Sequence, residues 1–171
     1  MGYRNKTYVA FASEDIDHYY MMKAWRANKN IEFDFYNAHD LYPARDASLD
    51  ESIKAQLRER MKNAKQFVLL GSSSGKKKGG NGTSFLAYEV KTMVNLGLPV
   101  VVANIEGNRR REIDRSLIPT PLLDADYYTL SVSFQPAIIK FALDKYAPQF
   151  VGSKKTGPHY YESDIYEKLG L

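Results

Sequence analysis

The fold of this chain is decided by a short central stretch, Phe67-Val68-Leu69-Leu70. All of its side chains are apolar, which predicts a strand that is buried on both faces and therefore lies centrally in a sheet. A second apolar run, Pro99 to Ile105, predicts another strand of the same kind. Between the two runs, Thr83 or Ser84 is suited to cap a helix that Gly97 ends. A strand, a helix and a strand in this order form the unit from which parallel sheets are built.

The sequence before this unit continues the alternation. Tyr8 to Ala12 predicts a short strand, and Ser13-Glu14-Asp15 signals the start of a helix that runs to about Asn28. Apolar and polar side chains then alternate from Ile31 to Tyr36, which is typical of a strand near a sheet edge. Ser48-Leu49-Asp50-Glu51 is a capping box and predicts another helix start. Apolar residues recur every fourth position in that helix: Leu49, Ile53, Leu57 and Met61.

The sequence after the central unit is less regular. Glu106 to Pro121 is polar and predicts an irregular segment, whereas Asp126 to Leu130 predicts a last strand. Ser133, with Pro136 in the first turn, opens a helix that is expected to end at Pro148. The alternation of strands and helices predicts an α/β fold, with a parallel sheet covered by helices on both faces. Ligands bind in such folds at the carboxyl ends of the strands.

Length and composition limit the classes of protein. The chain has 171 residues, which favours one domain. We expect this domain to span residues 1–148, with a C-terminal tail, residues 149–171, that packs on it or extends it. The chain has no cysteine, which excludes a disulfide scaffold, an iron–sulfur centre, a cysteine zinc site and a thiol nucleophile.

Charge and hydropathy give expectations about partners and location. The net charge is only +4, from 24 Lys and Arg against 20 Asp and Glu, so no nucleic-acid partner is expected. The longest apolar run, Pro99 to Ala103, is too short to cross a membrane. The N-terminus leads directly into a strand of five or six residues and has no signal-peptide core. We therefore expect a cytoplasmic protein.

Two motifs suggest a ligand site but do not fit one. Gly71 to Lys77 resembles a phosphate-binding loop, but only three residues separate its glycines, and a second lysine follows where Ser or Thr is needed. A flexible basic loop from Gly71 to Gly82 is therefore favoured. The three histidines have no metal-ligand spacing, so no metal site is expected; they are His18, His39 and His159.

One acidic residue stands out on the helix after this loop. Glu89 lies about one and a half turns into the helix, and Phe85 lies on the same side because it is four residues earlier. An acid near a helix N-terminus is favoured by the helix dipole, so its position alone does not indicate chemistry.

Three segments, taken together, resemble a known family. They are Thr7 to Asp15, Leu49 to Ser72 and Thr83 to Val90. Their order and spacing resemble TIR domains, and more closely the TIR-like proteins of bacterial Thoeris anti-phage defence. The resemblance covers about Lys6 to Pro148 and implies a flavodoxin-like three-layer fold.

The resemblance also implies a set of site residues. Phe11-Ala12-Ser13 matches the aromatic-x-Ser segment that ends the family's first strand. Phe85 and Glu89 match the family's aromatic residue and glutamate, with Phe in place of the usual Trp. The loop from Asn37 to Ala47 occupies the position of the loop that gates the family's site. The resemblance thus implies Glu89 as catalytic residue and five substrate-binding residues: Phe11, Ser13, Asp40, Ser72 and Phe85.

The function that the resemblance implies is cleavage of the nicotinamide–ribose bond of NAD⁺, which is a substrate here and not a cofactor. The product would be a cyclic ADP-ribose or an ADP-ribose conjugate that activates a separate effector protein. The family often completes its sites by assembly, which implies a homo-oligomer. Two alternatives stay open at this point: a non-catalytic TIR-like module that binds protein partners, and an enzyme like the nucleoside deoxyribosyltransferases, which would act on a nucleoside.

Overall fold

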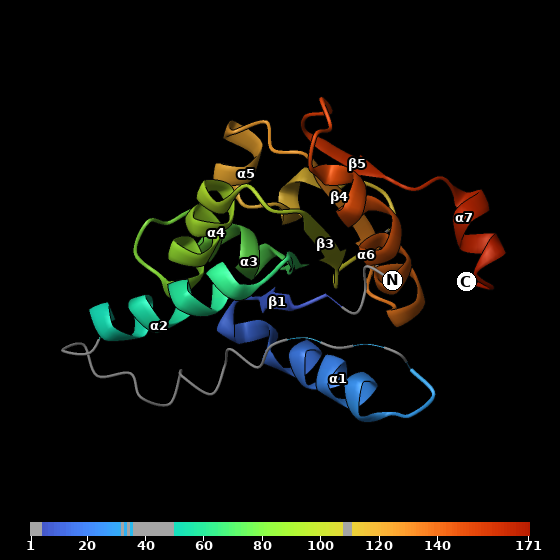
Figure 1. Cartoon of the computed structure of the whole chain (residues 1–171), viewed down its shortest axis with the longest axis horizontal. Coiled ribbons are helices and arrows are strands. Elements are labelled where there is room, and N and C mark those ends of the chain that lie inside the picture. Colours follow the sequence, from blue (N-terminus) through green and yellow to red (C-terminus); the bar gives the residue numbers. More distant parts are fainter. Residues whose placement is uncertain (1–4, 32, 34, 36–49, 108–110) are drawn as a thin grey trace.

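The computed structural model describes residues 5–31, 33, 35, 50–107 and 111–171. Its described part contains a five-stranded sheet in the order β1-β2-β3-β4-β5, in which all neighbouring strands are parallel. The chain therefore has the predicted α/β fold with a parallel sheet (Figure 1). The strands are β1 (Thr7–Ala10), β2 (Gln66–Gly71), β3 (Val100–Asn104), β4 (Thr129–Ser133) and β5 (Pro158–Tyr160).

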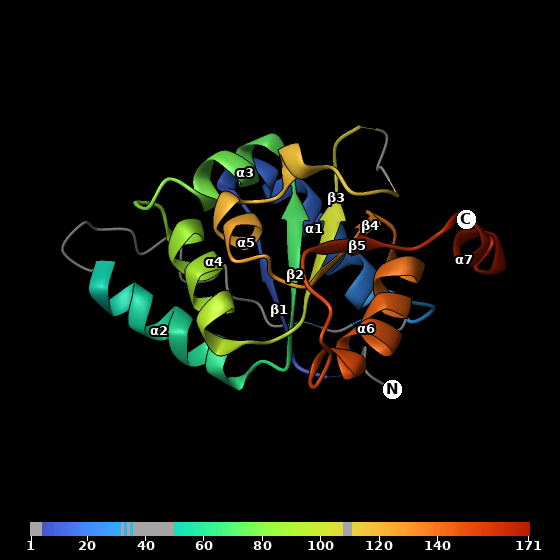
Figure 2. The ribbon, with the colours of Figure 1, turned by 90° about the horizontal axis from the view of Figure 1, so that it is seen from above.

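Helices cover both faces of the sheet, as Figures 1 and 2 show. One core cluster lies between the sheet and the helices α1 and α6, and the other lies on the opposite face beneath α2, α4 and α5. The helices are α1 (Ile16–Ala27), α2 (Asp50–Asn63), α3 (Ser73–Gly79), α4 (Phe85–Leu96), α5 (Thr120–Asp124), α6 (Pro136–Phe150) and α7 (Ser163–Lys168). Short 3-10 turns span Ser13–Asp15 and Arg115–Leu117.

The two central apolar runs form β2 and β3, as predicted, and every residue in both strands is buried. The predicted caps also hold for α4. The Ser84 side chain accepts a hydrogen bond from the Ala87 amide, and Gly97 ends the helix in the left-handed conformation at φ 62°. The stripe on α2 packs inward, since Ile53, Leu57 and Met61 are all buried. Ser48 and Leu49, which belong to the predicted capping box, lie outside the described residues.

The prediction of a flexible loop from Gly71 to Gly82 is wrong, because Gly71 ends β2 and α3 spans Ser73–Gly79. The Ser72 hydroxyl accepts a hydrogen bond from the Gly75 amide at 2.8 Å and so caps this helix. Gly79 lets α3 pack closely: a Cβ atom there would lie 2.7 Å from the side chain of Pro119. Glycine thus serves close packing here, whereas its abundance in the sequence suggested flexibility.

Further boundaries and elements differ from the prediction. Strand β4 begins at Thr129 because Asp126 has a positive φ of 47° and belongs to a turn. Helix α6 continues two residues beyond Pro148, which sits in its last turn. The segment predicted as irregular contains the 3-10 turn Arg115–Leu117, and α5 begins at its end, at Thr120. The C-terminal residues contain β5 and α7. The predicted strand from Ile31 to Tyr36 lies partly outside the described residues, and those of its residues that are described are not in a strand.

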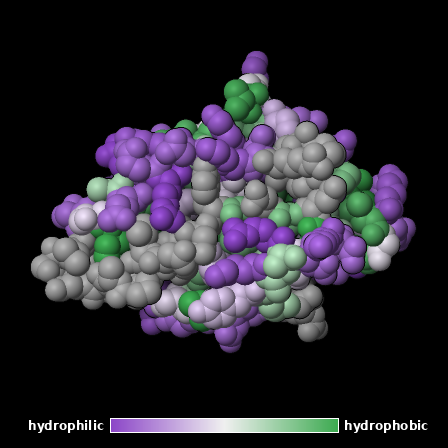
Figure 3. Space-filling model, turned by 60° about the horizontal axis from the view of Figure 1, so that its bottom comes forward, coloured by the Kyte–Doolittle hydropathy of each residue, from purple (hydrophilic) through white to green (hydrophobic). Residues whose placement is uncertain are grey.

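The C-terminal residues continue the same sheet and core. Strand β5 pairs with β4 through Thr129–Pro158, Leu130–His159 and Ser131–Tyr160. Tyr166 on α7 is fully buried, and its hydroxyl accepts a hydrogen bond from the Ser133 amide at 3.0 Å. Hydrophilic side chains dominate the face seen in Figure 3, where the hydrophobic side chains of the described residues form small groups.

Candidate functional site

Glu89 is a buried acid on α4, with only 1% of its surface exposed. The Tyr8 hydroxyl, from β1, donates a hydrogen bond to Glu89 Oε2 at 2.6 Å. A buried carboxylate is costly unless hydrogen bonds compensate for its lost hydration. The bond from Tyr8 supplies part of that compensation and fixes the carboxylate against the first strand.

Sequence reasoning did not identify Tyr8. Its position in an apolar strand suggested a core residue, and the Tyr8 ring does pack edge-to-face on Phe67, with centroids 6.0 Å apart. The available signal was chemical. A fully buried tyrosine hydroxyl usually has a hydrogen-bond partner, and the glutamate singled out on the helix, Glu89, was a suitable acceptor.

A second polar cluster lies at the carboxyl ends of β1 and β2. The buried Ser72 hydroxyl donates to the carboxylate of Asp15, and the same oxygen accepts from the Gly75 amide. Burial raises the pKa of Asp15, and the hydrogen bond from Ser72 opposes this change. Ser72 is therefore engaged by protein groups on both sides, as acceptor and as donor.

Lys78 links this cluster to the start of α4. Its ammonium group lies 2.7 Å from Glu14 Oε1 and donates to the Ser13 hydroxyl at 2.9 Å. The hydrogen bond from Lys78 is the main reason that the pKa of Glu14 is lowered. The Lys78 carbonyl accepts a hydrogen bond from the Ser84 hydroxyl at 2.7 Å, and Ser84 is the cap of α4. A lysine predicted to lie in a solvated loop thus joins the end of β1 to the helix that carries Glu89.

The structure brings some of the predicted site residues together. Ser13 and Ser72 lie at the ends of neighbouring strands, on either side of Asp15. Figure 2 shows the arrows of β2 and β3 pointing toward α3, so these ends lie on the side of the sheet that ligands occupy in parallel folds. Phe85 begins α4 one turn before Glu89 and packs, partly buried, against the same core cluster as Tyr8.

Phe11 does not join this group. Side chains alternate along β1, so Tyr8 and Ala10 face α4, whereas Val9 and Phe11 face α1. Phe11 is 1% exposed and stacks on Tyr19, with ring centroids 4.6 Å apart. The sheet therefore separates the Phe11 side chain from Glu89. Asp40 and the rest of the loop from Asn37 to Ala47 lie outside the described residues.

The structure thus places a buried carboxylate with a phenol donor, Glu89 with Tyr8, on α4 one helical turn after the partly buried ring of Phe85. A family model described as the TIR-like domain of the Thoeris protein ThsB matches residues 8–110, which is more than half of the chain. The chain belongs to this family.

The TIR-like domain is thereby assigned to Thoeris anti-phage defence. No curated protein matches the chain. The matched residues of the TIR-like domain include Tyr8, Glu89 and the whole polar cluster around Ser72, whereas β4, β5 and α6 follow the match.

Within residues 5–31, 33, 35, 50–107 and 111–171, no cluster of three or more His, Asp or Glu side chains is placed to bind a metal ion. None of the helices in that part of the chain has the length and apolar character to cross a membrane.

Proposed function

We propose that this TIR-like domain cleaves the nicotinamide–ribose bond of NAD⁺, with Glu89 as the catalytic carboxylate. The observation that supports this most is the Glu89 carboxylate, buried on α4 and held by the Tyr8 hydroxyl at 2.6 Å. Glu89 and Tyr8 both lie within residues 8–110, which the family model matches.

The chemistry requires little beyond such a carboxylate. Nicotinamide leaves NAD⁺ as a neutral ring, so the leaving group needs no proton. The bond breaks heterolytically, and the electron pair goes to the ring nitrogen. The positive charge that develops on the ribose is oxocarbenium-like and is stabilised by a carboxylate on one face of the sugar. A fixed orientation makes this stabilisation more effective, because the carboxylate does not have to reorganise during the reaction.

The product depends on what attacks the ribose next. A hydroxyl or ring nitrogen of the same molecule gives a cyclic ADP-ribose, water gives ADP-ribose, and another acceptor gives a conjugate. We propose a cyclic or conjugated product, which diffuses to a separate effector protein. Because Glu89 is almost fully buried, the side chains that cover it must move before a substrate contacts it. Assembly into a homo-oligomer is one way to drive such a change.

The same burial also favours a second candidate, a non-catalytic module that binds protein partners. In that case the bond between Tyr8 and Glu89 serves only to hold α4 against β1. The two candidates differ in whether NAD⁺ is consumed.

The test is a chromatographic assay of NAD⁺ at high protein concentration, with and without lysate from phage-infected cells. We expect the wild type to release nicotinamide and Glu89→Gln to lose at least about 100-fold in rate while keeping its circular dichroism spectrum. The matched control is Glu59→Gln, which changes an exposed glutamate on α2 that pairs with Lys62. A folded Glu89→Gln variant with wild-type turnover would refute the catalytic role. No nicotinamide release in either condition would favour the binding module.

A further inference from the structure

A pocket of about 320 Å³ lies between α6, β4 and β5. All the residues that line it fall between Tyr128 and Ile165, so it lies wholly in the part of the chain that follows the family match. Its size is at the lower end of the range of about 300–1,000 Å³ that is usual for small-molecule sites.

Aromatic rings form the walls of this pocket. Tyr128 contacts His159 edge-to-face, with centroids 5.0 Å apart, and Phe141 contacts Tyr161 in the same way at 5.4 Å. The Tyr146 hydroxyl is already engaged, because it donates to the Tyr128 carbonyl and accepts from the Val100 amide. These contacts hold the rings in place before any ligand binds, which lowers the entropic cost of binding.

The charged side chains around the pocket are all basic. Lys145 and Lys155 line it, and neither has an ion-pair partner among the described residues. The lining contains no Asp or Glu, as far as the structure describes it. Gln149 and Tyr161 add polar groups, and the Tyr161 hydroxyl is a protonated donor at neutral pH, as a phenol ordinarily is. Aromatic walls with an unpaired basic mouth suit a planar ligand that carries negative charge.

The pocket is distinct from the site around Glu89. Leu130, Phe141 and Ile165, which line it, belong to the core cluster beneath α1 and α6, whereas Tyr8 belongs to the cluster on the opposite face. In addition, β2 and β3 lie between β1 and β4 in the sheet. One ligand of this size therefore does not occupy both places.

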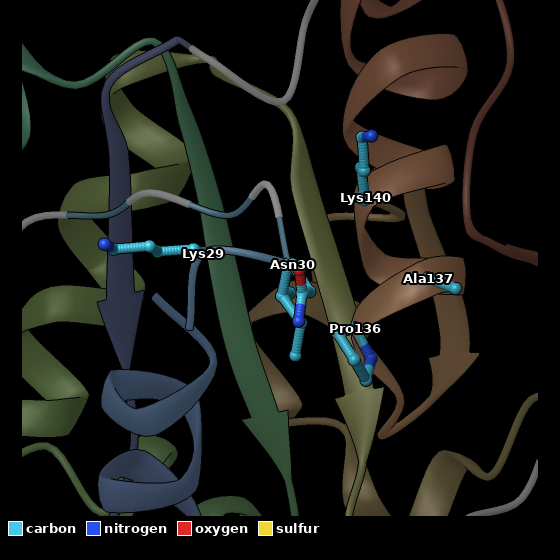
Figure 4. Close-up of a pocket in the computed structure, with 6 residues that line it drawn as sticks. Lys29, Asn30, Pro136, Ala137 and Lys140 are labelled. Carbon is cyan, nitrogen blue, oxygen red and sulfur yellow. The ribbon is translucent and has the colours of Figure 1, made fainter. Parts of the chain in front are cut away.

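A second hollow, of about 450 Å³, lies beside the start of α6 and is drawn in Figure 4. Lys29 and Lys140 contribute its charges, but the Lys29 side chain extends away from Pro136. Its basic groups do not converge on one point, and its described lining contains no aromatic ring. This second hollow therefore lacks the aromatic walls and the neighbouring charges that indicate a class of ligand for the pocket between α6, β4 and β5.

We propose that the pocket between α6, β4 and β5 binds a mononucleotide, with the base between the aromatic walls and the phosphate at Lys145 and Lys155. Bases stack on aromatic side chains whatever their identity, and the two lysines supply the charge that a phosphate requires. The proposal is independent of catalysis at Glu89.

Isothermal titration calorimetry on the full chain tests the proposal with three probes: AMP, adenosine and ribose 5-phosphate. We expect AMP to bind at least about tenfold more tightly than either of the others, because only AMP carries both base and phosphate. The double variant Lys145→Gln/Lys155→Gln is expected to bind AMP about tenfold more weakly and to bind adenosine with unchanged affinity.

The matched control is Lys154→Gln/Lys65→Gln, which removes the same charge from two exposed lysines that do not line the pocket. Glu89→Gln serves as the control for the other site and is expected to bind AMP like the wild type. The proposal is overturned if AMP binds no more tightly than about 1 mM, if both lysine pairs have the same effect, or if Glu89→Gln abolishes binding.

Discussion

The hydrogen bond between Tyr8 and Glu89 gives a direct measure of how the candidate site is held in place. Tyr8→Phe removes one oxygen atom and leaves the ring, which is fully buried and packs on Phe67. The change therefore creates almost no cavity. Its main effect is to remove the donor 2.6 Å from Glu89 Oε2. Hydrogen bonds to charged groups contribute about 1.5–3 kcal/mol, so we expect the free energy of unfolding to fall by about that amount.

Urea denaturation measures this loss as a lower midpoint at an unchanged m-value. Tyr88→Phe is the matched control, because it makes the same change on α4 at a half-buried tyrosine that lies over Lys54. We expect the control to stay within about 0.5 kcal/mol of the wild type. A loss of less than about 0.5 kcal/mol for Tyr8→Phe would refute the view that this bond fixes Glu89.

A double-mutant cycle separates the bond from other effects of the two changes. Tyr8→Phe removes the hydroxyl donor, and Glu89→Gln removes the charge of the acceptor. The double variant shows whether the two losses in the free energy of unfolding are coupled. We expect the losses to be non-additive by more than about 0.5 kcal/mol, as is usual for groups in contact. Strictly additive losses would mean that Tyr8 stabilises the fold without acting on Glu89.

Two further predictions concern the elements around the site. Gly79→Ala is expected to lower the free energy of unfolding, measured by thermal unfolding, by about 1–3 kcal/mol, because the added Cβ would meet the Pro119 side chain at 2.7 Å. In the control Gly80→Ala the Cβ meets nothing closer than 3.5 Å, so a much smaller loss is expected. Equal losses would contradict the close packing of α3. Burial raises the pKa of Asp15 above its ordinary value of 3.8, so wild-type folding loses stability as the pH rises through the raised pKa. Asp15→Asn lacks this loss, so its stability relative to the wild type is expected to increase as the pH rises above about 4, the pKa of an unfolded Asp. A pH-independent difference would show that the carboxyl titrates alike in both states.

The sheet was predictable where burial alone determines it. Phe67 to Leu70 and Pro99 to Ile105 are apolar because central parallel strands are covered on both faces. Strand β5 was not predictable in this way. It has three residues and begins with Pro158, which is acceptable only because β5 pairs with β4 alone in the described sheet. Helix α3 was missed because Gly75 and Gly79 pack closely in it, and sequence composition does not distinguish this use of glycine from a loop.

The candidate site was predictable in part. Glu89 followed from its position on a predicted helix together with the family resemblance, and the structure buries it against β1. The alternation of side chains along β1 already separates Tyr8 from Phe11, so the opposite orientation of Phe11 could have been inferred. The roles of Lys78 and Ser72 depend on α3, and they could not be inferred while that segment was taken for a loop.

The pairing of β5 with β4 has a consequence for shortened versions of the chain. A version that ends at Pro148 lacks β5 and α7, so the backbone of Thr129 to Ser131 loses its partner on one side and pairs with β3 alone. It also loses Tyr166, whose hydroxyl accepts from the Ser133 amide. A strand edge with unpaired backbone groups is a template for pairing with other chains. Such a version is expected to aggregate. The last 23 residues (171 − 148 = 23) therefore protect the edge of β4 from pairing with other chains.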